Sequence, residues 1–150
     1  NTVKCLFRSG NAENLGKLAN TSFVRKNNGW FKNGIAPDIA LDESVLSIKE
    51  LEIYSKYLSE NGFFGPGSWY MNTELNNEYY KKAPLQKLKK PTLFIHAKYD
   101  RVCDTCHTSL ADPMRENCSN LKEATIESGH WMAQEKPDDV NKTIKEWLAI

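Results

Sequence analysis

Residues 91–150 alternate strand-like and helical segments, and this pattern constrains the fold more than any other feature. The apolar run Leu93–Ile95 follows Pro91 and predicts a strand buried on both faces of a parallel sheet. A helix over about 105–117 and a second strand over Ala124–Glu127 should follow. Together with a final helix, this order is typical of βαβ units, so we expect an α/β fold.

The final helix has clear start signals. Pro137 suits its first turn, and Asp138 and Asp139 favour the positive end of the helix dipole. Four apolar residues then recur at helical spacing: Val140, Ile144, Trp147 and Leu148. This stripe predicts an amphipathic helix from Pro137 to the end of the chain.

Helical signals dominate before Pro84, where no strong strand pattern occurs. Residues 2–8 should end a helix that Ser9–Gly10 stops, and residues 20–42 should be loop. A firmer helix is predicted over about 47–60. Its apolar face contains Leu51, Tyr54 and Leu58.

The change of pattern at Pro84 divides the chain into two parts. Residues 1–83 form a helical portion, in which a further helix should start near Trp69 or Tyr70, and residues 84–150 carry the βα units. Two strands are fewer than the roughly five or six of a typical open sheet. We therefore expect the remaining strands to come from elsewhere.

Composition argues against two classes of partner. The 150 residues carry 20 basic and 19 acidic side chains, so nothing indicates a nucleic-acid surface. The apolar stretches are far shorter than the ~20 residues that span a bilayer. Asn1 is not a natural translation start, so evidence on targeting is missing; the compartment stays open, with the cytoplasm favoured.

The four cysteines, Cys5, Cys103, Cys106 and Cys118, leave alternatives open. Free thiols in ordinary packing are the default, and a Cys103–Cys118 disulfide is a lesser alternative. The CDTC spacing could serve a redox or zinc site, but the further ligands nearby are poorly spaced. We expect no metal and no cofactor.

Asp100 and His130 are the candidate catalytic residues. Asp100 directly ends the first strand, and His130 follows Ser128–Gly129 after the second, where catalytic groups collect in α/β folds. A carboxylate there can fix a histidine tautomer, and the imidazole can act as a general base toward water. A solvated turn is the alternative for Asp100, and Asp104 is a competing acid.

Other residues complete the candidate set. In FFGPGSWY, a Gly–Pro–Gly turn brings Tyr70 to the start of a helix, and its phenol could donate to an oxygen that gains negative charge. Alternatively, Trp69 and Tyr70 only fill the space between layers. His96 should be a packing residue inside the first strand, and His107 a surface residue.

Three segments resemble the soluble epoxide hydrolase family of the α/β-hydrolase superfamily. GFFGPGSWYMN (62–72) is similar to its cap motif, usually close to GFxGPLxWYRN. LFIHAKYDRVC (93–103) resembles the acid-bearing strand, and SGHWMAQEKPDDVNKTIKEWL (128–148) resembles the histidine loop and last helix. LFRSG (6–10) also resembles part of the cap, so the likeness covers nearly the whole chain; Ser68 and Met71 depart from the family pattern.

The resemblance implies a fold, a reaction and roles. The chain would be the C-terminal portion of an α/β-hydrolase, with 1–83 as part of the helical cap and 84–150 as the last βα units. In the family, an aspartate attacks an epoxide to form an ester, cap tyrosines protonate the epoxide oxygen, and a histidine activates water to release a vicinal diol. Asp100 would be the orienting acid, His130 the base and Tyr70 a cap tyrosine.

The implied enzyme is incomplete in these residues. No G-x-S-x-G-like or G-x-D-x-G-like nucleophile elbow occurs, so we expect the nucleophile on an N-terminal half that acts as a partner chain. A homodimer of the whole enzyme stays open. We expect Phe63, Trp69 and Trp131 to contact the epoxide substrate. The alternatives are a haloalkane dehalogenase, an esterase, or a hydrolase-like protein that binds a ligand without turnover.

Overall fold

A computed structural model describes residues 1–24, 26–83 and 87–149, apart from the side chain of Trp69. In this part of the chain, two parallel strands, β1 (Thr92–Ala97) and β2 (Leu121–Ile126), form a sheet. They pair in register along their whole length. Because both strands run in the same direction, their carboxyl ends lie at one edge of the sheet.

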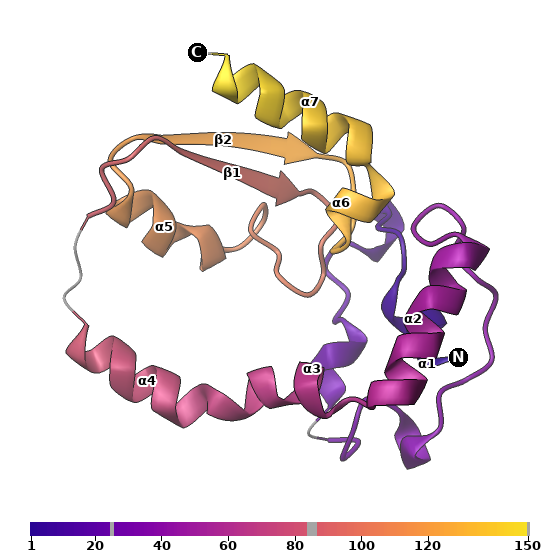
Figure 1. Cartoon of the computed structure of the whole chain (residues 1–150). Helices are drawn as coiled ribbons and strands as arrows, with labels where there is room; N and C mark the ends of the chain where they lie inside the picture. The colour runs from indigo at the N-terminus through magenta and orange to yellow at the C-terminus, as the bar shows by residue number, and fades with distance from the viewer. Residues whose placement is uncertain (25, 84–86, 150) are drawn as a thin grey trace.

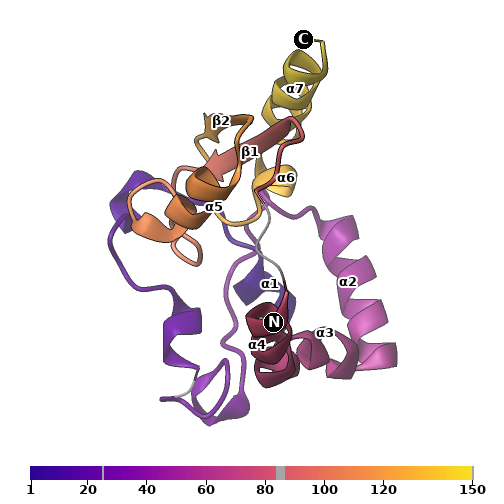
Figure 2. The same ribbon diagram turned by 90° about the vertical axis from the view of Figure 1, so that its left-hand side faces the viewer.

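Helices cover the two faces of this sheet. α5 (Asp112–Asn117) lies on one face and α7 (Pro137–Leu148) on the other, as Figures 1 and 2 show. A short helix, α6 (Met132–Glu135), leads into α7. The order strand, helix, strand, helix confirms the predicted α/β arrangement, and α7 confirms the predicted final helix.

β1 is less buried than predicted for a strand that is covered on both faces. Its residues are half-buried except for His96, which is 4% exposed. Among the described residues, β1 has β2 as its partner on one side only. A strand at the edge of a two-stranded sheet keeps part of each face in contact with solvent.

The crossover between the strands is less helical than predicted over 105–117. Turns occupy the first part, then η5 (Ser109–Ala111) precedes α5. The Asp104 carboxylate accepts the backbone N–H groups of Cys106 and His107 at 3.2 and 2.9 Å, and such local bonds compete with a helix. Pro113 fits only the first turn of a helix, which explains the late start of α5.

β2 begins at Leu121 and ends at Ile126, so the predicted strand over Ala124–Glu127 started too late and ended one residue too far. The early part was missed because Lys122 and Glu123 are exposed and polar. Glu123 accepts hydrogen bonds from Arg115 and lies 2.8 Å from Nε2 of His96, so polar contacts hold this half of the strand.

The hydrophobic core lies where the first residues of the chain meet α2 (Ile48–Asn61). α1 (Thr2–Leu6) packs beside α2. The buried core residues are Val3, Phe7, Val45 and Leu46. The predicted helix over 47–60 is confirmed: Ser47 caps α2 through a reciprocal pair of hydrogen bonds with Glu50, and Gly62, with φ 70°, ends it.

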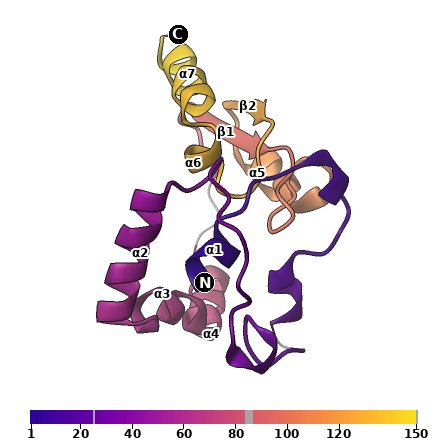
Figure 3. The same ribbon diagram turned by 90° about the vertical axis from the view of Figure 1, so that its right-hand side faces the viewer.

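The segment after α2 is helical from an earlier residue than predicted. α3 (Phe64–Ser68) leads into η4 (Trp69–Asn72) and α4 (Thr73–Lys82) on the side of the molecule away from α7, as Figure 3 shows. Pro66 lies in the first turn of α3, where no backbone N–H is needed for the helix. The Gly–Pro–Gly run is therefore part of a helix, and the helix starts at Phe64 instead of near Trp69 or Tyr70.

The segment 20–42 was predicted as loop and contains short 3₁₀ turns. These turns are η2 (Asn20–Phe23) and η3 (Lys32–Gly34), and η1 (Ala12–Asn14) precedes them. The cysteines are free, so the Cys103–Cys118 disulfide is not formed. In the described part of the chain, every helix is too short or too polar to cross a membrane.

Candidate active site

Asp100 lies in the turn directly after β1, and this turn continues the pairing between the strands. The N–H of Lys98 donates to the carbonyl of Ile126 at 2.9 Å, and the N–H of Tyr99 donates to the carbonyl of Ser128 at 2.9 Å. The two strand ends therefore stay side by side as far as the candidate residues. Asp100 is 8% exposed.

Both oxygens of the Asp100 carboxylate have partners. Oδ1 accepts the backbone N–H groups of Val102 and Cys103 at 2.8 and 3.0 Å. Oδ2 lies 2.9 Å from Nδ1 of His130. Because an ionised carboxylate only accepts, Nδ1 carries the proton in this pair, and Nε2 keeps the lone pair that can take a proton from water.

Hydrogen bonding and burial oppose each other at this pair. Burial would raise the pKa of Asp100, but the hydrogen bonds from His130, Cys103 and Val102 outweigh it and hold that pKa below its ordinary value. The hydrogen bond to Asp100 raises the pKa of His130, although burial works in the other direction. The carboxylate thus stays charged, and the imidazole becomes a stronger base.

The other predicted alternatives for the acid and the base lie elsewhere. Asp104 accepts from the backbone of His107 and lies 2.9 Å from Nδ1 of His107, whose side chain is 46% exposed. His96 is buried between Thr105 and Glu123. The structure therefore brings Asp100, and not Asp104, against His130.

Among the described residues, no hydrogen bond joins the hydroxyl of Tyr70 to the Asp100–His130 pair, and the side chain of Phe63 has no group that could form one. Tyr70 is 73% exposed and Phe63 is 51% exposed. Phe63 directly precedes α3, and Tyr70 lies in η4 between α3 and α4. The side chain of Trp69 lies outside what the structure describes. The roles of these three residues stay predictions.

Trp131 packs against the core. Its ring stacks on Phe7 with 4.3 Å between ring centroids, and its Nε1–H donates to the carbonyl of Leu6 at 2.6 Å. The ring also meets His130 edge to face, with 5.4 Å between centroids. The predicted substrate contact of Trp131 stays a prediction, while its contacts in the structure attach the histidine loop to the start of the chain.

Sequence reasoning missed Glu135 and Gly10. The Glu135 carboxylate accepts the backbone N–H of Gly129 at 2.7 Å and that of Gly10 at 3.2 Å. Gly10 and Glu135 are 125 residues apart, so no local spacing indicates the contact. The only sequence signal is an acidic residue shortly after the histidine, and such residues are common on surfaces.

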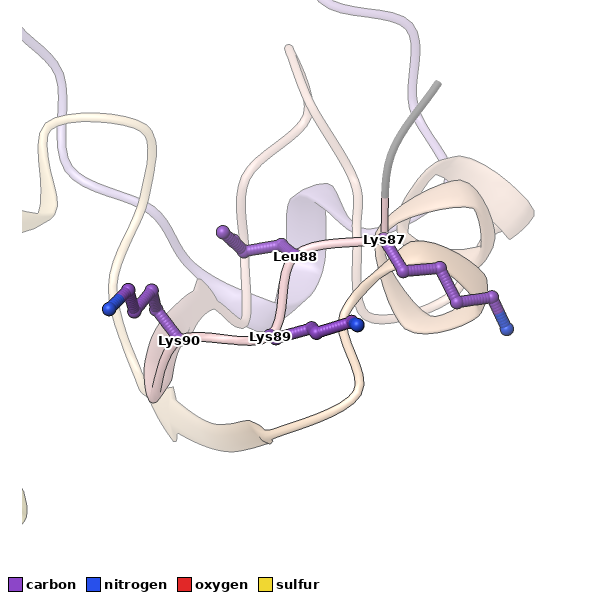
Figure 4. A pocket seen from close by; sticks show the side chains of 4 residues that line it. All are labelled: Lys87, Leu88, Lys89 and Lys90. Atoms are coloured by element: carbon purple, nitrogen blue, oxygen red, sulfur yellow. The ribbon is translucent and has the colours of Figure 1, made fainter. Parts of the chain in front are cut away.

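A hollow of about 540 Å³ lies away from the candidate pair. Lys87, Leu88, Lys89 and Lys90 line it, as Figure 4 shows. These residues precede the start of β1, whereas Asp100 follows its end. The hollow is therefore not part of the candidate site. Within residues 1–24, 26–83 and 87–149, no group of three or more His, Cys, Asp or Glu side chains is arranged to hold a metal ion.

Comparison with curated proteins finds epoxide hydrolases. The chain is 37% identical to bifunctional epoxide hydrolase 2 of Rattus norvegicus over 155 residues, which cover 98% of this chain and 25% of the relative. It is 30% identical to epoxide hydrolase A of Mycobacterium tuberculosis over 104 residues, which cover 69% of this chain and 32% of the relative. The chain thus spans between a quarter and a third of these relatives. No family model matches it.

Comparison with solved structures finds the same class. Epoxide hydrolase A from Mycobacterium thermoresistibile matches with a TM-score of 0.65 at 25% identity, over 81% of this chain and 37% of that chain. A variant of the epoxide hydrolase from Solanum tuberosum matches with a TM-score of 0.65 at 21% identity, over 92% of this chain and 48% of that chain.

The fold is that of a C-terminal portion of an α/β-hydrolase, with a parallel sheet covered by helices and a helical segment beside it. The sequence relatives and the solved structures to which this chain is similar are both epoxide hydrolases, and the similarity to the rat protein extends over 98% of the chain.

Proposed function

We propose that this chain supplies the water-activating half of an epoxide hydrolase active site. The observation that carries the proposal is the 2.9 Å contact between Nδ1 of His130 and Oδ2 of Asp100. An aspartate from outside these 150 residues attacks an epoxide carbon, and the ring opens to give an ester. Nε2 of His130 then takes a proton from water, which hydrolyses the ester and releases a vicinal diol.

Asp100 has two tasks in this scheme. Its hydrogen bond fixes the tautomer that leaves Nε2 free, and its charge stabilises the imidazolium that forms when water is deprotonated. Two backbone N–H groups hold its other oxygen, so the carboxylate cannot turn away from His130. The raised pKa of His130 strengthens the base that the scheme needs.

The helical portion, residues 1–83, is proposed to act as part of the cap over the substrate. Tyr70 would donate its phenol proton to the epoxide oxygen as the ring opens. Phe63, Trp69 and Trp131 would contact the apolar part of the epoxide. The exposure of Tyr70 and Phe63 supports this role, because both side chains can reach a ligand.

The nucleophile is proposed to lie on an N-terminal half that binds this chain, because no nucleophile elbow motif occurs here. Gel filtration with intact-mass analysis tests this: we expect association with that half, and a monodisperse 17.1 kDa monomer would contradict it. The same measurement on the whole enzyme tests for a homodimer. Cell fractionation tests the cytoplasmic location that we propose.

The function is tested by epoxide-to-diol assays of the assembled enzyme, which contains these residues and the half with the nucleophile. His130→Ala should form the ester but hydrolyse it about 10²- to 10⁴-fold more slowly, so mass spectrometry should detect the enzyme plus one epoxide. His107→Ala is the matched control and should keep the native rate. Diol formation at the native rate by His130→Ala would show that His130 is not the base.

The identity of the nucleophile separates the remaining alternatives. An aspartate fits an epoxide hydrolase or a haloalkane dehalogenase, and a serine fits an esterase. Turnover of epoxides but not of haloalkanes or esters would support the proposal. Binding of epoxides without any diol would indicate a ligand-binding protein.

A further inference from the structure

Two glycine backbones touch beside His130. A Cβ atom on Gly10 would lie 2.4 Å from the backbone nitrogen of Gly129, and one on Gly129 would lie 2.6 Å from the nitrogen of Gly10. Neither glycine has a positive φ, so the requirement is for close approach and not for a left-handed turn. Residue 129 directly precedes His130, which makes this contact one end of the catalytic loop.

One carboxylate joins the two glycines. Oε2 of Glu135 accepts the N–H of Gly129 at 2.7 Å and the N–H of Gly10 at 3.2 Å, and Oε1 lies 3.4 Å from the latter. Gly129 is buried, and Glu135 is half-buried at the end of α6. Removing the carboxylate would leave two backbone donors without this partner in a tightly packed place.

The segment that receives the histidine loop is itself held in place. Asp42 accepts the N–H and the hydroxyl of Ser9 through one oxygen, at 2.9 and 2.7 Å. On the other side of His130 in the sequence, Trp131 donates a hydrogen bond to the carbonyl of Leu6 and stacks on the ring of Phe7. The residues before and after His130 are therefore both attached to residues 6–10.

We propose that Glu135 is a positioning residue for His130, because its carboxylate holds the Gly129 peptide against Gly10 and so directs the imidazole toward the reacting water. The hydrogen bond to Asp100 fixes one point of the ring but lets the ring swing about that point. Fixing the peptide before His130 removes this freedom and sets where Nε2 lies. The inference rests on the proposed function of His130.

The test separates positioning from a general effect on stability. In the assembled enzyme, Glu135→Ala should slow ester hydrolysis about 10- to 100-fold, as a displacement of about 1 Å can do. Ester formation should stay within about twofold, because His130 does not act in that step. Glu135→Gln keeps one acceptor oxygen and should restore most of the rate. Glu146→Ala, at an exposed glutamate of α7, is the matched control and should change neither step.

Equal slowing of both steps by Glu135→Ala, or no slowing of hydrolysis, would overturn the proposal. If that variant does not fold, Glu135→Asp decides. Its carboxylate is one methylene shorter and cannot reach both glycines, so hydrolysis should be about 3- to 10-fold slower with ester formation unchanged. An unchanged hydrolysis rate in the folded Glu135→Asp enzyme would overturn the proposal.

An NMR measurement tests the positioning role of Glu135 independently of whether the enzyme forms a diol. In ¹⁵N-labelled wild-type enzyme, the Nδ1–H proton of His130 should give a downfield signal that exchanges slowly with water, and Glu135→Ala should broaden it or speed its exchange. If the wild type makes no diol but this change occurs, the proposed function fails and the positioning role stands. If the wild type makes diol and Glu135→Ala leaves the signal unchanged, the positioning role is overturned.

Discussion

The end of the sheet and the α3–α4 segment carry candidate residues in opposite surroundings. Asp100 is 8% exposed and has hydrogen bonds to both oxygens, whereas Tyr70 is 73% exposed. α3 and α4 contain no buried side chain among the described residues. Contacts within this chain thus hold the Asp100–His130 pair in place, whereas the phenol of Tyr70 is open to solvent.

The largest expected effect on a rate comes from substituting Asp100, at the well-packed end of the sheet. Asp100→Asn should slow ester hydrolysis about 10²- to 10⁴-fold, because an amide can donate to Nδ1 and so favour the wrong tautomer. Single-turnover kinetics in the assembled enzyme measure this. Asp104→Asn is the matched control and should stay near the native rate; a larger loss there than in Asp100→Asn would make Asp104 the acid.

Tyr70→Phe tests the exposed α3–α4 segment. It should slow ring opening about 10- to 100-fold, since one donor to the developing oxyanion is lost, and leave hydrolysis of the ester unchanged. Rapid quench of the ester-forming step measures the effect. Tyr79→Phe, at an exposed tyrosine of α4, should have no effect. Unchanged ester formation in Tyr70→Phe would remove this phenol from the site.

Glycine substitutions compare the packing of the two regions directly. Gly10→Ala should lower the free energy of unfolding by about 1–3 kcal/mol, because the added methyl group meets the Gly129 backbone. Gly67→Ala in α3 meets no atom within 4 Å, and its stability should stay the same or rise slightly. Urea denaturation measures both. Equal losses would mean that the two regions are packed alike.

The pH dependence of ester hydrolysis, which tests His130, should also differ from that of ring opening, which tests Tyr70. In the proposed mechanism, ester hydrolysis needs neutral His130, so its rate should rise about tenfold per pH unit up to the raised pKa and then level off. Asp100→Asn removes the hydrogen bond from the carboxylate and should move this limb to lower pH. Ring opening should not follow the same limb. A hydrolysis rate that is flat between pH 5 and 8 would contradict the assignment of His130.

The contribution of His130 to the stability of the fold should decrease as the pH rises, whereas the rate of ester hydrolysis should increase. Because the folded pKa of His130 lies above its unfolded value, the pairing of protonated His130 with Asp100 stabilises the fold fully below the unfolded pKa. This contribution is lost as the pH rises through the folded pKa. With His130 as the proposed base, the rate of ester hydrolysis should rise over the pH range in which this contribution to stability declines. Denaturation of wild type and His130→Ala across that range checks the sign.

The sequence predicts the parts of the molecule that depend on local patterns. The apolar run at 93–95 and the stripe after Pro137 indicate a strand and a helix without knowledge of their neighbours. Asp100 and His130 could be paired in advance because residues after parallel strands meet at one edge. Local hydrogen bonds in the crossover compete with helix formation there, which is why the helix predicted over 105–117 is shorter.

Contacts between distant residues were beyond sequence reasoning. Nothing near Gly10 indicates that it touches Gly129, and nothing near Glu135 shows that its carboxylate has two backbone donors. The Gly–Pro–Gly run was misread because proline and glycine are typical of turns, although Pro66 is tolerated in a first helical turn.

The contact between Gly10 and Gly129 has a consequence for how the chain folds. The two residues are separated by most of the sequence, and closing so long a loop is slow compared with forming a helix or a hairpin. During synthesis, the segment at residues 9–10 emerges early and waits for the histidine loop. We therefore expect His130 to become ordered late, after the helices of residues 1–83 and β1, so that a partly folded or truncated chain lacks an ordered His130 even when Asp100 is in place.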